Sequence, residues 1–210
     1  MAFKLYTYAL QNDTGFAPCY ENGEYTLACC KPNLRADLFN SQEKDDVWIV
    51  GYWRIKGDEV YLVYVAKIEQ VLALENYYDS GIYGTRSDCI YDNVKSLCTE
   101  KKNVRKATKI ETLYPDYIQH ENQYHNRSNI RTDLYGNCVL YSKTFAHFPR
   151  LAVSVPDILM PLTRDNRDFR SFPKKENGEA DTVRQELEAL LLSDKQEIII
   201  RPWGNKKKTR

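Results

Sequence analysis

The chain has 210 residues, of which 42% are hydrophobic and 28% are charged, and its formal net charge is only +1. This balance argues against a constitutive coat for duplex DNA, because such proteins are usually strongly basic. The length favours a single domain, which we expect over residues 1–204, followed by a basic, disordered tail over residues 205–210.

The six cysteines form no CxxC pair, and they are sparse for a secreted, disulfide-rich protein of this length. No signal peptide precedes the first strand-like segment, and no apolar run approaches the roughly 20 residues that span a bilayer. We therefore expect reduced thiols in a cytoplasmic protein that does not associate with a membrane. The sequence leaves the oligomeric state open.

Alternation of apolar and polar side chains predicts a series of strands in the first third of the chain. The expected strands cover residues 4–10, 25–30 and 46–53, and the run 59–74 begins as a strand and then bends or continues into another. Gly51, inside the third strand, indicates a bulge or a close approach of the backbone. The short turn before residue 59 favours a hairpin.

The segments between and after these strands are less regular. Their polar composition predicts a connector over residues 33–45, a short helix over residues 75–79, and an ordered loop or flexible insertion over residues 111–131. Residues 138–148 and residues 197–203 are further strand candidates.

Residues 182–192 are predicted to form an amphipathic helix, because apolar side chains recur on one face at helical spacing. Thr182 and Gln185 have the spacing of a capping box at its start. Strands outnumber helices and follow one another across short turns, which argues against a doubly wound parallel sheet. We predict an α+β, β-rich fold, either a curled antiparallel sheet or a small barrel, with one or two packed helices.

The common signatures of phosphate, dinucleotide and zinc sites are missing from the sequence. There is no GxxxxGK[ST], no GxGxxG and no HExxH, and His120 and His125 do not have the i, i+4 spacing of two zinc ligands on a helix. We therefore predict no cofactor and no metal. His120, His125 and His147 are the available general bases, and each is interpreted first as a surface or structural histidine.

Adjacent Cys29 and Cys30 precede a lysine at the end of a predicted strand. A thiol becomes a nucleophile only beside a base or a positive field, and Lys31 can supply such a field. The simpler interpretation, which the pattern favours, is a pair of small strand residues of which at least one is buried.

Aromatic residues gather in the strand predicted over residues 46–53. Trp48, Tyr52 and Trp53 are able to stack on a base, since aromatic faces accept planar rings. Strand alternation places Trp48 and Tyr52 on one face and Trp53 on the other, so at least one of these faces is expected in the core.

Several blocks of sequence together match a known pattern: TGFAP at residues 14–18, YTLACCKP at residues 25–32, and DVWIVG at residues 46–51. Further matches extend the similarity over roughly residues 4–175. The chain resembles the second of the nucleotide modification associated domain families, and it is also similar to domains with the PUA-like fold, which bind bases in a small barrel. The resemblance implies association with nucleotide or base modification, typically in phage and prokaryotic conflict settings.

Under this resemblance we predict a module that binds a nucleotide or modified base, with single-stranded nucleic acid as a further partner. Lys31 is expected to face a phosphate or base carbonyl, and Asn93 to read a base edge through its amide. The predicted ligand-binding residues are Phe16, Cys30, Lys31, Trp53, Tyr91, Asn93, Tyr141 and Lys143.

Two other functions stay open at this point. One is an enzyme that modifies or hydrolyses a nucleotide, with Cys30 or His147 as the reactive group and Lys31 tuning the charge. The other is a phage-type protein that sequesters a signalling nucleotide or a host protein. The absence of a paired acid–base motif in the sequence favours binding over catalysis.

Overall fold

The computed structural model describes residues 3–41, 45–55, 59–97, 110–148, 152–163, 169–172 and 179–193. Within these ranges the α-helices are α1 (Pro32–Phe39), α2 (Leu74–Tyr78), α4 (Ile130–Tyr135) and α5 (Glu179–Ser193). Short 3-10 helices cover Ile110–Thr112, Arg127–Asn129 and Met160–Leu162. The strands are β1 (Phe3–Ala9), β2 (Cys19–Glu21), β3 (Glu24–Leu27), β4 (Asp46–Arg54), β5 (Val60–Ile68), β6 (Gln70–Leu72), β7 (Tyr91–Asp92), β8 (Ile118–Gln119), β9 (Val139–Ser142), β10 (Thr144–His147) and β11 (Phe169–Phe172).

The largest sheet has the strand order β10-β5-β4-β1-β11. The β4–β5 hairpin forms its centre, and β1 runs parallel to β4 while the other neighbours are antiparallel. The register of the hairpin shifts between Gly51 and Tyr52, where a Cβ on Gly51 would collide with the Tyr64 ring. Gly51 therefore permits both the bulge and the close approach of a buried aromatic ring.

A second sheet has the order β2-β3-β9-β6, and β7 and β8 form a separate antiparallel pair. The described strands thus form open, curved sheets of mixed and antiparallel pairing, which confirms the predicted α+β class. Of the two architectures that the sequence left open, the curled sheet is the one these strands form, and they close no barrel.

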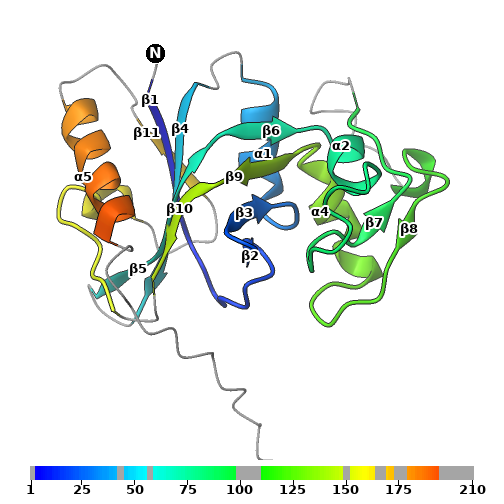
Figure 1. The fold of residues 1–210 in the computed structure, drawn as a ribbon, viewed down its shortest axis with the longest axis horizontal. Helices are drawn as coiled ribbons and strands as arrows, with labels where there is room; N and C mark the ends of the chain where they lie inside the picture. Colours follow the sequence, from blue (N-terminus) through cyan, green and yellow to red (C-terminus); the bar gives the residue numbers. More distant parts are fainter. Residues whose placement is uncertain are drawn as a thin grey trace, which may run out of the picture.

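Three hydrophobic cores lie between the layers of the fold. Figure 1 shows how the helices and sheets are arranged. Helix α5 covers one face of the large sheet and contributes Val183, Leu187 and Leu190 to the first core. The second sheet and α1 cover the opposite face, where Leu34 and Leu38 of α1 are fully buried. The third core lies beyond the second sheet, among α2, α4 and the β7–β8 pair.

Most of the predicted elements are present, and the exceptions have clear physical causes. The connector predicted over residues 33–45 is wrong at its start, because Pro32 occupies the first turn of α1 and residues 34 and 38 form a buried i, i+4 pair. The strand predicted over residues 138–148 is two strands, β9 and β10, which enter different sheets on either side of Lys143.

Two further boundaries also differ from the prediction. The strand predicted over residues 25–30 ends at Leu27. The capping box at Thr182 is wrong because α5 already begins at Glu179. The strand predicted over residues 197–203 and the tail over residues 205–210 lie outside the described residues.

Candidate functional site

Cys30 and Lys31 form a tight backbone elbow between β3 and α1. Both have left-handed backbone conformations, with φ of 61° at Cys30 and 42° at Lys31. For a residue with a side chain this conformation costs about 1–2 kcal/mol, and such conformations concentrate at functional sites. The elbow turns the Cys30 side chain out of the strand direction at the start of α1, so that it is partly exposed, whereas Cys29 is fully buried.

The buried guanidinium of Arg35 holds the elbow against the segment after the 3-10 helix Arg127–Asn129. Its Nε donates to the Cys30 carbonyl at 2.8 Å, and its Nη1 donates to the Cys138 carbonyl at 2.6 Å. Its Nη2 donates to the carbonyls of Thr132 and Asp133. A fully buried guanidinium must satisfy its donors, so this set of bonds fixes α1 and α4 relative to one another.

The Cys30 thiol, an imidazole and a carboxylate form a continuous hydrogen-bonded chain. The Cys30 Sγ lies 3.5 Å from Nε2 of His125, and Nδ1 of the same ring lies 2.6 Å from Oδ2 of Asp133. The side chain of Asp133 is fully buried and that of His125 is 10% exposed. A nucleophile, a base and a group that orients the base are arranged in this order in enzymes that use covalent catalysis.

The surroundings of His125 favour its protonated form. Burial lowers the pKa of the imidazole, but the hydrogen bonds to Asp133 and Cys30 outweigh that effect and raise the pKa from 6.5 to about 9. The ring is therefore an imidazolium at neutral pH, and it can give a proton to a leaving group beside Cys30.

The Asp133 carboxylate has two further donors, which fix its orientation. The backbone N–H of Cys30 donates to Oδ1 at 3.0 Å, and the buried Tyr91 hydroxyl donates to Oδ2 at 2.8 Å. Both carboxylate oxygens are thus satisfied in the interior. The elbow and the imidazole share the same carboxylate, so the distance between thiol and ring is set by one rigid group.

A pocket of about 480 Å³ opens beside this chain of groups. Its wall includes the end of β1, the loop that follows β1, the elbow and start of α1, and the segment that carries Tyr124 and His125. The volume is within the range of pockets that hold small ligands, about 300–1,000 Å³. Aromatic side chains line it in several places: Tyr8, Phe16, Tyr124 and Phe169.

Three of the eight predicted ligand-binding residues line this pocket: Phe16, Cys30 and Lys31. The Lys31 ammonium lies 4.2 Å from the centre of the Tyr8 ring and donates to the Ala9 carbonyl at 3.3 Å. The strand end that the sequence singled out therefore carries the pocket's thiol and a cation side by side.

The other five predicted residues lie away from the pocket wall. Trp53 packs against the second core. Tyr91 reaches the site only indirectly, through its bond to the Asp133 carboxylate. Asn93 has a left-handed backbone with φ of 58° and uses its side-chain amide to donate to the Asp116 carbonyl at 3.1 Å.

Tyr141 and Lys143 gather instead around Glu24 on the second sheet. The Tyr141 hydroxyl donates to Glu24 Oε1 at 2.7 Å, and the Lys143 ammonium lies 3.8 Å from the same oxygen. This ion pair is partly exposed, and the pocket wall includes none of the three residues.

Sequence reasoning missed His125, Asp133 and Tyr124. His125 was interpreted as a structural histidine, and the segment 111–131 as a loop with no assigned role. The one available signal was the combination of a histidine with an asparagine-rich segment, in which the Asn122 side chain accepts from the His125 N–H at 2.6 Å. The pairing with Cys30 spans 95 residues of sequence and has no local signature.

One combination of ligands in this region is able to hold a metal ion. Ligand atoms of Cys29, His125 and Asp133 lie within 4.8 Å of one another. Structural zinc sites use four protein ligands, and catalytic zinc sites use three with water in the fourth position. This group supplies three, and its His125 and Asp133 ligand atoms are joined by a hydrogen bond of 2.6 Å. The hydrogen-bonded chain from Cys30 shares His125 and Asp133 with this group, and the fully buried Cys29 lies outside that chain.

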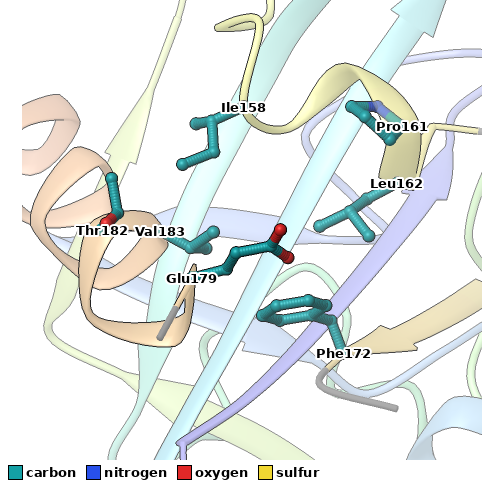
Figure 2. Close-up of a pocket in the computed structure, with 7 residues that line it drawn as sticks. All are labelled: Ile158, Pro161, Leu162, Phe172, Glu179, Thr182 and Val183. Atoms are coloured by element: carbon teal, nitrogen blue, oxygen red, sulfur yellow. The ribbon is translucent and has the colours of Figure 1, made fainter. Parts of the chain in front are cut away.

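A second groove of about 390 Å³ lies between the start of α5 and the 3-10 helix Met160–Leu162. Figure 2 shows the Glu179 carboxylate among apolar neighbours such as Leu162 and Phe172. No cysteine, histidine, lysine or arginine is among the described residues that line this groove.

The fold is an α+β domain with a partly exposed thiol beside a pocket, and a comparison with protein families shows to which family it belongs. Residues 2–206 match the model of the family described as nucleotide modification associated domain 2, so the chain belongs to that family. Neither the curated proteins nor the solved structures contain a match to this chain. No helix among the described residues has both the length and the apolar character needed to cross a membrane.

Proposed function

We propose that this protein is a thiol-dependent enzyme that acts on a nucleotide or a modified base bound in the pocket beside Cys30. The observation that supports this most strongly is the chain from the Cys30 Sγ through the His125 imidazole to the buried Asp133 carboxylate. The left-handed elbow at Cys30 and Lys31 is the second support, because strained backbone conformations of non-glycine residues concentrate at functional sites.

Each residue has a defined part in the proposed reaction. The Cys30 thiol first releases its proton to solvent, and the resulting negative charge is balanced by the His125 imidazolium. The sulfur then attacks an electrophilic carbon of the substrate, forming an S–C bond while the bond from that carbon to the leaving group breaks. His125 gives its proton to the leaving group. Water then attacks the same carbon and gives a proton to His125, and the S–C bond breaks to regenerate the free enzyme. Asp133 acts as a positioning residue that keeps the imidazole aligned.

Two features support a nucleotide as the substrate class. The family is associated with nucleotide modification. The pocket also combines aromatic side chains, such as Tyr124 and Phe169, with the Lys31 ammonium. Aromatic faces stack on bases, and a cation suits a phosphate or a base carbonyl.

The test is a search for turnover and for a covalent intermediate. The purified protein is incubated with nucleoside monophosphates and with modified nucleosides, products are separated by chromatography, and adducts are sought by intact-protein mass spectrometry. We expect product or an adduct with the wild-type protein and neither with Cys30→Ala. Turnover that survives Cys30→Ala would overturn the proposal.

A binding module without catalysis is the second candidate, and the pocket itself favours it. Its volume and aromatic lining suit a nucleoside whether or not the thiol reacts. In that case a nucleotide raises the melting temperature equally in the wild type and in Cys30→Ala, and no product or adduct forms.

A further inference from the structure

We propose that the pocket receives an unpaired base, with Tyr124 as its stacking platform and the side-chain amides of Gln11 and Asn12 as the groups that read its hydrogen-bonding edge. This inference rests on the proposed function of the same pocket and names its substrate class. A base inside a duplex presents neither a free face nor a free Watson–Crick edge, so the substrate is a free nucleotide or an unpaired base of a single strand.

Tyr124 has the features of a stacking platform. Its ring is 40% exposed, although it lines the pocket. On its inner side it packs against Phe16, with ring centres 4.8 Å apart and an angle of 32° between the planes. Phe16 is itself only 2% exposed and also contacts the His125 ring, at 4.9 Å. The Tyr124 ring is thus supported from behind by a buried aromatic side chain and lies near the Cys30–His125–Asp133 chain. Such a supported face is well placed to stack on a planar base.

The loop that follows β1, which we call the rim loop, carries polar side chains with free hydrogen-bonding capacity. Gln11, Asn12 and Thr14 line the pocket and are exposed. In the described part of the chain, none of these three side chains has a protein hydrogen-bond partner. A carboxamide offers a donor and an acceptor side by side, which matches the paired groups on the edge of a base.

The rim loop is fixed at both ends, so these amides are presented in a defined place. The Leu10 N–H donates to the Tyr52 carbonyl at 2.8 Å, which anchors the start of the loop to β4. The Asp13 carboxylate lies 2.7 Å from His147 Nε2 on β10, and Gly15 permits the following turn with φ of 72°. Groups that are already in place bind a ligand with less loss of conformational entropy.

The Cys30→Ala variant, which binds without turning over, allows affinity to be measured by calorimetry. The ligands are the four nucleoside 5′-monophosphates, ribose 5-phosphate, an oligothymidine single strand and a matched duplex. We expect monophosphates or the single strand to bind at least about 10-fold more tightly than ribose phosphate and the duplex, since stacking alone contributes about this factor. Preference for the single strand over the monophosphates identifies a nucleic-acid substrate, and the reverse identifies a free nucleotide.

Further substitutions in the Cys30→Ala variant distinguish the contribution of stacking to affinity from that of hydrogen bonds to the edge of the base. Tyr124→Ala should weaken binding of every base by roughly 10- to 100-fold, whereas Gln123→Ala, at the neighbouring exposed position, should leave binding unchanged. The double substitution Gln11→Ala and Asn12→Ala should reduce the differences in affinity among the four monophosphates by about 10-fold. It should leave the affinity for ribose 5-phosphate unaltered. Thermal melting checks that each variant is folded.

The inference is overturned if folded Tyr124→Ala binds the monophosphates and the single strand as tightly as the parent. It is also overturned if the duplex binds as well as the single strand. Turnover and thiol reactivity of the wild-type protein are measured separately, so loss of base recognition in these assays with an intact Cys30-dependent reaction would reject this inference without rejecting the proposed enzyme.

Discussion

Two histidine–aspartate pairs hold segments of the pocket wall, and they differ in their surroundings: His125 itself lines the pocket, whereas Asp13 lies in sequence between the lining residues Asn12 and Thr14. His125 lies 2.6 Å from Asp133, and His147 lies 2.7 Å from Asp13. The first pair is almost fully buried. The other ring nitrogen of His125, Nε2, lies 3.5 Å from the Cys30 Sγ. The second pair is more exposed, and its ring packs against Tyr20 with centres 4.4 Å apart.

The comparison teaches that a histidine–aspartate pair alone does not define a candidate reactive site. The distinguishing feature is a third group, here the Cys30 thiol, beside the imidazole. A carboxylate beside an imidazole is common on protein surfaces, as the exposed pair of His120 and Asp92 at 2.7 Å also shows. Among the histidine–aspartate pairs of the described residues, the pair at Asp133 is the one that joins a thiol, a strained backbone elbow and a pocket. The pair at Asp13 ties the rim loop to β10, so its role is to hold the pocket wall in place.

The largest effect is expected from removal of the thiol itself. Cys30→Ala should reduce turnover of the substrate found in the screen by on the order of 10⁴-fold or more, because nothing else replaces the nucleophile. Cys89→Ala, which removes a partly buried thiol outside the pocket, should change turnover by less than about 2-fold and serves as the matched control. Steady-state kinetics on both variants provide the measurement.

The next largest effect is expected to be a difference in kcat between variants of the two histidines. His125→Asn should lower kcat by about 10²–10⁴-fold, the usual contribution of a positioned acid–base group, with KM little changed. His147→Asn should leave kcat within a few-fold and act mainly on KM, since it loosens the rim loop. Equal losses of kcat in the two variants would contradict the distinction drawn between the pairs.

Gly136→Ala tests the scaffold behind the reactive pair. A Cβ at this position would lie 2.7 Å from Nε of Arg35, whose bonds hold Cys30 and Asp133 together. Overpacking of this kind costs about 1–3 kcal/mol of unfolding free energy, so the urea midpoint should fall and thiol reactivity with it. Gly84→Ala is the control, because its nearest neighbour is 3.8 Å away; an equal fall in both variants would argue against the role of Arg35.

Tyr91→Phe removes one donor from the Asp133 carboxylate and nothing from the pocket wall. Loss of a hydrogen bond to a buried charge costs about 1.5–3 kcal/mol, so the free energy of unfolding should fall by an amount of this order. The pH dependence of kcat should shift as well, because the carboxylate orients His125. A fall in stability with an unchanged pH profile would mean that Tyr91 has a purely structural role.

The pH dependence of stability is the smallest of the expected effects. The pKa of His125 rises from 6.5 to about 9 on folding, because its bonds to Asp133 and Cys30 outweigh burial. The protonated pair therefore stabilises the fold fully below pH 6.5, and this contribution is lost as the pH rises through 9. When melting temperature is plotted against pH, the curves of the wild type and His125→Asn should converge between pH 6.5 and about 9. Parallel curves would show that protonation of the pair is not coupled to folding.

Much of the fold follows from local sequence patterns. Alternation located β1, β4 and β5 of the large sheet, whereas β11 was not predicted. The conformational freedom of Gly51 predicted the bulge. Helix α1 was missed because its polar composition concealed Leu34 and Leu38, whose burial depends on the facing sheet. Local periodicity reports which face of an element is apolar, and it does not report which partner covers that face.

The candidate site was predictable only in part. The block that ends in Cys30 and Lys31 was recognisable, because its residues are adjacent in the sequence. His125 and Asp133 are about a hundred residues away, and a buried arginine and a shared carboxylate bring them to the thiol. Contacts of this kind have no spacing rule, so the absence of a paired acid–base motif in the sequence was weak evidence against catalysis.

The most direct test of the central claim is the rate at which iodoacetamide alkylates Cys30, followed by peptide mass spectrometry as a function of pH. The account predicts that Cys30 reacts faster than Cys89 at pH 7, that His125→Asn slows it at least about 10-fold, and that His147→Asn leaves it unchanged. A Cys30 rate that is the same in the wild type and in folded His125→Asn would contradict the account.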